Sequence, residues 1–282
     1  MHVLILFFKT VALRPYVFTF LAAFLLTGII SMGLWRTFTF FGVVWAIAFL
    51  SEISSTRTGF PYGLYHYTGI TRGQELYIGN VPFMDSLSYT FLLFASFSLA
   101  LFSLAPLRIQ KGDVQVADTF RIRWSWSVLF LTSVYMMMID FVIDPAALRG
   151  ERWFLGKIYY YEYEGHYFGV PLSNALGWGL IGLVAMFLYQ RIEKRWFGPG
   201  FRDRGIRVWP LRGLFGVGLY YGVLAFILTV TWWIGEYGLF IAGCFIYVIP
   251  ATSLILKLVD RRARGTEAEW QNHLHDFQVV LR

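Results

Sequence analysis

Seven long runs of apolar residues constrain what this chain can fold into. They cover roughly residues 15–34, 37–54, 82–105, 125–145, 172–190, 212–233 and 236–258. A helix needs about 20 mostly apolar residues to cross the hydrocarbon core of a bilayer, and these runs are about that long. The sequence therefore predicts an all-α protein, a polytopic integral membrane bundle of about seven transmembrane helices.

The composition agrees with a membrane protein and argues against a nucleic-acid partner. Of the 282 residues, 57% are hydrophobic and only 15% are charged, whereas a soluble domain carries about 25% charged residues. The net charge of +7 does not indicate nucleic-acid binding, because the basic residues fall between apolar runs rather than on one solvated domain.

The distribution of basic residues predicts how the bundle is oriented. Arg36, the loops 106–124 and 191–212, and the end of the chain from Lys257 onward hold 17 lysines and arginines, and the opposite side holds 7. Because cytoplasmic loops carry the excess of positive charge, we expect the N-terminus outside and the C-terminus inside. We expect one transmembrane domain over 1–260, a polar cytoplasmic tail over 261–282, and a location in a bacterial or archaeal cell membrane.

Six polar side chains map to the non-cytoplasmic end of the predicted bundle. They stand near the ends of five different spans: Glu52, Asp85, Asp140, Asp144, Asn174 and Glu236. A carboxylate at the centre of a spanning helix costs at least about 2.5 kcal/mol, so such groups face one another or a wet cavity and are candidates for function.

Several of these acids also have a simpler interpretation. Asp85 can complement the dipole of the helix that it opens. Glu52 and Glu236 can lie among lipid headgroups. Asp144 can be an exposed acid at a helix end, because the following Pro145 favours ending the helix there.

The pair of aspartates in MMMIDFVIDP, residues 136–145, is the strongest candidate. Asp140 and Asp144 are four residues apart and share one helix face. Two carboxyl groups this close in an apolar setting favour a form in which one keeps its proton, and such a group is a general acid. The simpler alternative for Asp140, which lies one turn deeper, is a salt bridge to Arg57, Arg149 or Arg152.

Two loops on the same side are rich in Gly, Tyr and Phe. They read GFPYGLYHYTGI, residues 59–70, and GKIYYYEYEGHYFGVPL, residues 156–172. Tyrosines often form a belt at the membrane interface. Alternatively, the loops form a lid over a pocket, where aromatic ring faces can stabilise a carbocation.

Several classes of chemistry lack their residues here. The single Cys244 allows no intrachain disulfide and no cysteine metal site. The five histidines are too few for a membrane di-iron desaturase, His66 and His166 are isolated, and no glycine-rich nucleotide motif is present. Lys257 lies too near a helix end for a retinal Schiff base. There is one D-x-x-x-D segment, where membrane prenyltransferases use two. We therefore expect neither a metal nor a cofactor.

The chemistry that remains is protonation of an alkene to a tertiary cation, followed by capture of water. Four segments strengthen this interpretation: EISSTRTGFPYGLYHYT, NVPFMDSLSY, DFVIDPAALRGERW and YFGVPLSNALGW. Over about residues 45–185 they resemble the carotenoid biosynthesis proteins that include the membrane carotenoid 1,2-hydratases, of the γ-carotene 1',2'-hydratase and bisanhydrobacterioruberin hydratase type. The resemblance implies addition of water across the terminal double bond of an acyclic (ψ) end group.

Roles follow from that chemistry. We expect Asp140 to donate the proton, Asp144 to tune it or position water, and Glu52 to be the competing donor. The substrate is expected to contact Asn174, which would hold water or the new hydroxyl, and the pocket residues Tyr65, His66, Tyr67, Asp85, Trp153 and Tyr167.

The expected partners are a carotenoid dissolved in the bilayer, lipid and water, and association with other carotenoid enzymes is left open. Two rival functions also remain. One is another isoprenoid enzyme, a cyclase or a prenyltransferase. The other is a transporter or receptor whose acids bind a cation or relay protons.

Overall fold

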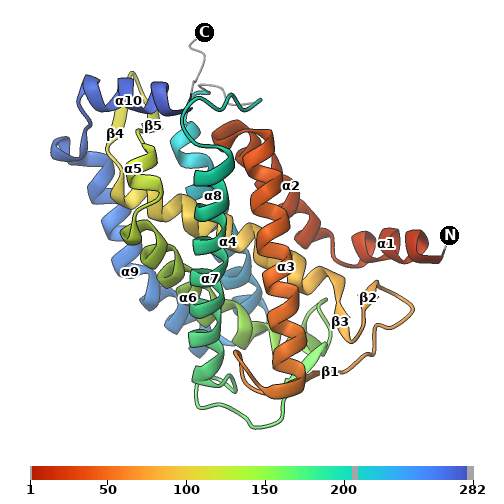
Figure 1. The fold of residues 1–282 in the computed structure, drawn as a ribbon. Coiled ribbons are helices and arrows are strands. Elements are labelled where there is room, and N and C mark those ends of the chain that lie inside the picture. The colour runs from red at the N-terminus through yellow and green to blue at the C-terminus, as the bar shows by residue number, and fades with distance from the viewer. Residues whose placement is uncertain (1, 205–208, 278–282) are drawn as a thin grey trace.

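The computed structural model describes residues 2–204 and 209–277 and shows an all-helical bundle (Figure 1). Seven of its helices are long and apolar enough to cross a membrane, which confirms the predicted architecture. These helices are α2 (Pro15–Met32), α3 (Leu34–Thr58), α4 (Phe83–Leu104), α6 (Trp126–Ala147), α7 (Leu172–Trp196), α8 (Arg212–Trp233) and α9 (Tyr237–Val259). The direction in which the bundle crosses the membrane stays a prediction.

Among the helices that extend past the bounds expected from sequence, α3 and α6 do so beside the acids. Helix α3 runs to Thr58, so Glu52 lies inside it and is buried, which corrects the headgroup interpretation. Helix α6 continues through Pro145, and Asp144 is 9% exposed rather than an exposed helix end. The helix continues because the N–H of Leu148 still donates to the Asp144 carbonyl at 2.9 Å. The Arg149 guanidinium then caps the Pro145 carbonyl, also at 2.9 Å.

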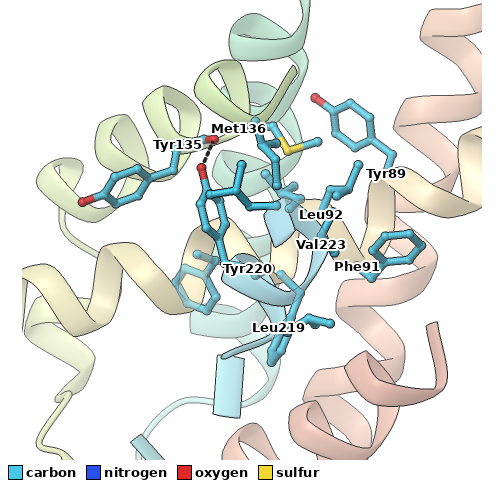
Figure 2. Packing of buried hydrophobic residues seen from close by; sticks show 14 of the residues in the cluster. Tyr89, Phe91, Leu92, Tyr135, Met136, Leu219, Tyr220 and Val223 are labelled. Carbon is cyan, nitrogen blue, oxygen red and sulfur yellow. Dashed lines mark hydrogen bonds between the residues drawn. The ribbon is translucent and has the colours of Figure 1, made fainter. Parts of the chain in front are cut away.

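Helix α4 forms the centre of the bundle. In its most apolar stretch of 18 residues, 78% of the residues are buried, whereas the same share for the peripheral helix α9 is 17%. Such burial is expected for a helix that is hydrophobic on all sides. Figure 2 shows Leu92 packed with Met136 of α6 and Val223 of α8. Four serines on α4, which are Ser88, Ser96, Ser98 and Ser103, donate their hydroxyls to carbonyls of the same helix; Ser96, for example, donates to Leu92 at 2.8 Å.

Short elements cover the two ends of the bundle. One end carries two strand pairs: β1 (Tyr65–Tyr67) with β6 (Tyr159–Tyr161), and β2 (Tyr77–Ile78) with β3 (Val81–Pro82). Helix α1 (His2–Leu13) extends sideways from the bundle, on the side where β2 and β3 lie (Figure 1). The other end carries β4 (Leu107–Gln110) paired with β5 (Asp113–Val116), α5 (Phe120–Arg123) and α10 (Glu267–Phe277). The 3-10 turns are η1 (Gly150–Arg152) and η2 (Arg261–Ala263).

A buried ion pair fastens the loops at the first end to the start of α2. The Arg14 guanidinium donates to both carboxylate oxygens of Glu75 at 3.1 Å and to the Leu155 carbonyl at 2.6 Å. Both charged side chains are fully buried. One guanidinium therefore joins the loop after α3 to the loop after α6, and breaking it would leave a buried charge unpaired.

The opposite end is held by a larger charged network. The Arg123 guanidinium binds Glu193 at 2.8 Å and Asp118 at 3.2 Å. The Arg212 Nη2 lies 2.8 Å from His273 Nε2, which must accept because a guanidinium only donates. His273 Nδ1 therefore carries the proton and donates to the Asp118 carbonyl at 2.6 Å.

This network docks the last described helix onto the bundle. The stretch expected to be a polar tail contains α10, whose Trp270, Leu274 and Phe277 are buried against Ala117 and Phe120. The tail therefore hides one apolar face while its other face stays polar, as in an amphipathic helix.

The Asp118 carboxylate makes this docking sensitive to acid. Burial by itself raises the pKa of Asp118, but the His273 hydrogen bond and the charges of Arg123 and Arg212 outweigh it and lower the pKa to about 2. A carboxylate whose pKa falls on folding stabilises the fold above its ordinary pKa, and this stability is lost as the pH falls toward the lowered value.

We predict that docking of α10 weakens by about 2 kcal/mol between roughly pH 4 and pH 2. Amide hydrogen exchange of residues 267–277 measures this. Asp118→Asn should exchange faster at neutral pH and lose the acid transition. Asn272→Ala, at an exposed position of the same helix, is the control and should leave exchange unchanged. An acid transition that persists in Asp118→Asn would contradict the assignment.

Candidate functional site

The two aspartates of α6 are joined through an asparagine of α7. The Asn174 amide donates to Asp140 Oδ1 at 2.8 Å and to Asp144 Oδ2 at 2.6 Å. The four-residue spacing puts both carboxyl groups on the face of α6 that meets α7. Asp140 is 1% exposed, and Asn174 is equally deep at 2%. One amide thus supplies a donor to each of two carboxyl groups that have little water around them.

No salt bridge accounts for these aspartates. Within residues 2–204 and 209–277, no lysine or arginine forms an ion pair with Asp140 or Asp144. Arg149 instead pairs with Glu236 at 3.0 Å, and Arg152 pairs with the same carboxylate. Glu236, which the sequence grouped with the other acids, therefore belongs to a separate ion cluster at the rim.

A second acidic wall faces the first from α3 and α4. The Tyr67 hydroxyl donates to Asp85 at 2.5 Å and lies 3.4 Å from Glu52. Burial, and then the nearby Asp85 and Glu52 carboxylates, raise the pKa of Tyr67 well above its ordinary value. The phenol therefore keeps its proton and acts as the donor that both carboxyl groups share.

A polar cavity of about 50 Å³ lies between the two walls. It is large enough for water, since about 10–15 Å³ suffices for one molecule. Its lining offers several hydrogen-bond partners, as a buried water needs. These are Glu52, Ser88, Asp85, Asp144, Asn174, Tyr62, Tyr65, Tyr159 and Tyr161.

An apolar cavity of about 100 Å³ adjoins the polar one. Most of its lining is aliphatic or aromatic, from α2, α4, α6, α8 and the loop after α6. The two cavities share five lining residues: Asp85, Ser88, Asp144, Tyr159 and Trp178. Asp144 therefore faces both the wet and the apolar space, whereas Asp140 lines neither.

The two aromatic loops meet over these cavities. Strands β1 and β6 pair antiparallel, with Tyr65 opposite Tyr161 and Tyr67 opposite Tyr159. The Tyr161 hydroxyl lies 3.5 Å from Asp144 Oδ2. Burial and then the Asp144 charge raise the pKa of Tyr161 well above its ordinary value, so its phenol too stays protonated. Of the two interpretations left open for these loops, the geometry favours the lid.

Of the three other predicted site residues, one lines the apolar cavity and two line neither cavity. Trp153 lines the apolar cavity, and its indole donates to the Ala146 carbonyl at 3.0 Å. His66 points outward and lies 3.5 Å from Glu162, with 42% of its side chain exposed. Tyr167 packs edge-on against Phe141, at 5.2 Å between ring centroids, and lines neither cavity.

Several lining residues were not singled out from the sequence, and spacing signals exist for four of them. Trp178 stands one helical turn after Asn174, and Ser88 stands three residues after Asp85, so each shares a face with a predicted residue. Tyr159 and Tyr161 alternate within a strand and so point to the same side.

Metal-binding side chains do not gather in the part of the chain that the structure describes. Within residues 2–204 and 209–277, no group of three or more His, Cys, Asp or Glu is placed to hold a metal ion.

Comparisons with known proteins identify the family of the chain. Residues 1–250 match the family model described as carotenoid biosynthesis protein. Bisanhydrobacterioruberin hydratase of Haloarcula japonica is 32% identical over 139 residues, which are 49% of this chain and 40% of that protein. The match therefore covers less than half of the curated relative's length. No solved structure matches the chain.

We predict that Asn174→Leu destabilises the bundle by about 2–4 kcal/mol, because two buried carboxyl groups each lose their donor. Thermal unfolding in detergent measures the loss. Adding Asp140→Asn should restore part of it, since the new amide can donate to Asp144. The control is Ser173→Ala on the neighbouring exposed side chain. Unchanged stability in Asn174→Leu would contradict the bridging role.

Proposed function

The chain belongs to the family of carotenoid biosynthesis proteins, and on that premise we propose that it adds water across the terminal C1=C2 double bond of an acyclic (ψ) carotenoid end group. The observation that carries the proposal is the shared wall of the two cavities. A carboxyl group, Asp144, lies where a space suited to water adjoins a space suited to hydrocarbon. The named hydratase relative supports the same reaction class.

The proposed reaction begins with proton transfer. A carboxylic acid on the shared wall protonates C2 of the alkene, the π electrons form the new C–H bond, and C1 becomes a tertiary cation. The faces of Trp153, Tyr159 and Trp178 line the apolar cavity, where their quadrupoles favour a positive charge. Excluding bulk water keeps the cation from reacting at the wrong place or time.

Water capture completes the proposed reaction. A water molecule held in the polar cavity bonds to C1 through oxygen, and the resulting oxonium ion gives one proton to a carboxylate. Return of that proton to Asp144 through water in the polar cavity, which the accepting carboxylates and Asp144 line together, restores the starting state, and the net change is one water added. Glu52 and Asp85, which share the Tyr67 donor on the opposite wall, are placed to receive that proton. Neither a redox cofactor nor a metal is needed for this balance.

The cavities favour Asp144 as the proton donor. The sequence suggested Asp140 because it lies deeper, but depth alone does not bring a group to the substrate. Asp144 and Asp85 both line the two cavities, while Asp140 stands behind Asp144 on the other side of the Asn174 amide. Asp85 already accepts the Tyr67 hydroxyl at 2.5 Å, so we assign it to receive a proton and Asp144 to donate one. We propose that Asp140 positions Asn174 and Asp144, and that Glu52 accepts a proton from water.

We predict that Asp144→Asn lowers hydration at least about 100-fold, the usual contribution of a general acid. Asp140→Asn should retain more activity, because its amide can still occupy the same place beside Asn174. The measurement is product mass in a host that accumulates lycopene, with protein in the membrane fraction quantified in parallel. Asp260→Asn, an exposed aspartate after α9, is the matched control.

The same assay separates the alternatives. Loss in Asp140→Asn with normal product from Asp144→Asn would transfer the donor role to Asp140. A product of unchanged mass would indicate a cyclase, and one larger by an isoprenoid unit a prenyltransferase. Unchanged pigment with the wild-type protein in hosts making lycopene or γ-carotene would refute hydration and favour a transporter or receptor.

A further inference from the structure

The apolar cavity is much smaller than the molecule that the proposed function assigns to it. Its volume of about 100 Å³ lies below the roughly 300–1,000 Å³ of typical ligand pockets. A ψ end group can be inserted only in part, so the rest of the polyene has to extend out of the bundle. The question is which wall of the cavity it crosses.

The lid is a poor exit because hydrogen bonds and a buried charge hold it. Arg14 joins Glu75 and the Leu155 carbonyl across the two loops. The Trp153 indole is bonded to the Ala146 carbonyl at the end of α6. Opening the lid would break these bonds and separate Arg14 from Glu75. A buried charge that loses its partner is strongly unfavourable. It would also lead an apolar chain toward water.

The wall between α2 and α8 is built differently. From α2 it presents Tyr16, Val17 and Phe20, and from α8 Val223, Phe226 and Ile227. The Phe226 ring stacks on Tyr16 at 5.4 Å between centroids and meets Phe20 edge-on at 5.7 Å.

Three rings at this wall reach the outside of the bundle. Tyr16, Phe20 and Phe226 are each half-buried. In Figure 2, Val223 and Phe91 lie on the inner side of the same wall. Turning the Phe226 ring would disturb its ring contacts with Tyr16, Phe20 and Phe154 but would separate no buried ion pair, so this wall opens at less cost than the lid.

We propose that the seam between α2 and α8 is the lateral opening through which the carotenoid end group passes from the bilayer core to Asp144, with the Phe226 ring as its gate. The ligand's identity rests on the proposed function, while the opening itself rests on the cavity and its walls. The polyene then lies outside along the seam, and one end group is inserted at a time.

The test measures passage without relying on hydration. In a Cys244→Ala background, Ile143→Cys places a thiol in the lining of the apolar cavity. A pyrene maleimide dissolved in proteoliposome membranes reports how fast that thiol is reached. Phe226→Trp should slow labelling about tenfold, because added ring atoms overpack the seam, and Phe226→Ala should speed it.

The matched controls are Phe215→Trp and Phe215→Ala, at a half-buried phenylalanine on the same helix that lines neither cavity. Both should label at the parent rate. Equal labelling rates in the two Phe226 variants and the parent would overturn the gate. So would equal changes in the Phe215 variants.

Hydration is assayed separately in the same variants without the reporter thiol. Labelling that follows Phe226 while the wild type hydrates nothing would keep the opening and refute the proposed function. Normal hydration together with labelling that ignores Phe226 would refute the opening alone.

Discussion

Two carboxyl groups one helical turn apart, buried between α6 and α7, are the constraint around which this end of the bundle is arranged. In the part of the chain that the structure describes, no cation pairs with Asp140 or Asp144, and the Asn174 amide supplies the donors that water would otherwise provide. This arrangement holds α6 and α7 together at one depth. A buried amide that donates to two acids also leaves their remaining oxygen positions open for chemistry.

The two ends of the bundle use charge in different ways. At the end with α10, Arg123, Glu193 and Asp118 form ion pairs that fix loops and the last helix. At the lid end, the pair Arg14–Glu75 and the Glu236 cluster at the rim fasten the loops, and within the described residues the donors to the carboxyl groups beneath them are amides and phenols. Acids that are already paired with guanidinium groups cannot readily exchange protons. Those beneath the lid can, which is why the proposed reaction belongs at that end.

The two adjoining cavities suit two reactants that do not mix. Water and a carotenoid do not dissolve in each other, so an enzyme that joins them must bring each to one acid from a separate side. Asp144 lies on the wall that the polar and apolar cavities share. Hydrogen bonds hold the lid on one side of the cavities, whereas aromatic rings meet at the seam between α2 and α8 on another side. The lid is therefore the stiffer boundary.

The amino-acid sequence by itself determined the seven spans, because hydrocarbon demands about 20 apolar residues per helix and this signal is local. It also identified the acids that gather beneath the lid, since their positions near span ends place them at one depth. It misplaced Glu236, whose arginine partners come from a distant loop, and it treated Pro145 as the end of a helix that Arg149 and a retained backbone bond continue.

Only the tertiary structure decided which acid meets the substrate space. Depth along α6 favoured Asp140, but access depends on what α7, α8 and the strands β1 and β6 leave open around α6, and no local pattern encodes that. Tyr159, Tyr161 and Trp178 became lining residues for the same reason: a cavity is the space left by packing between segments far apart in the chain.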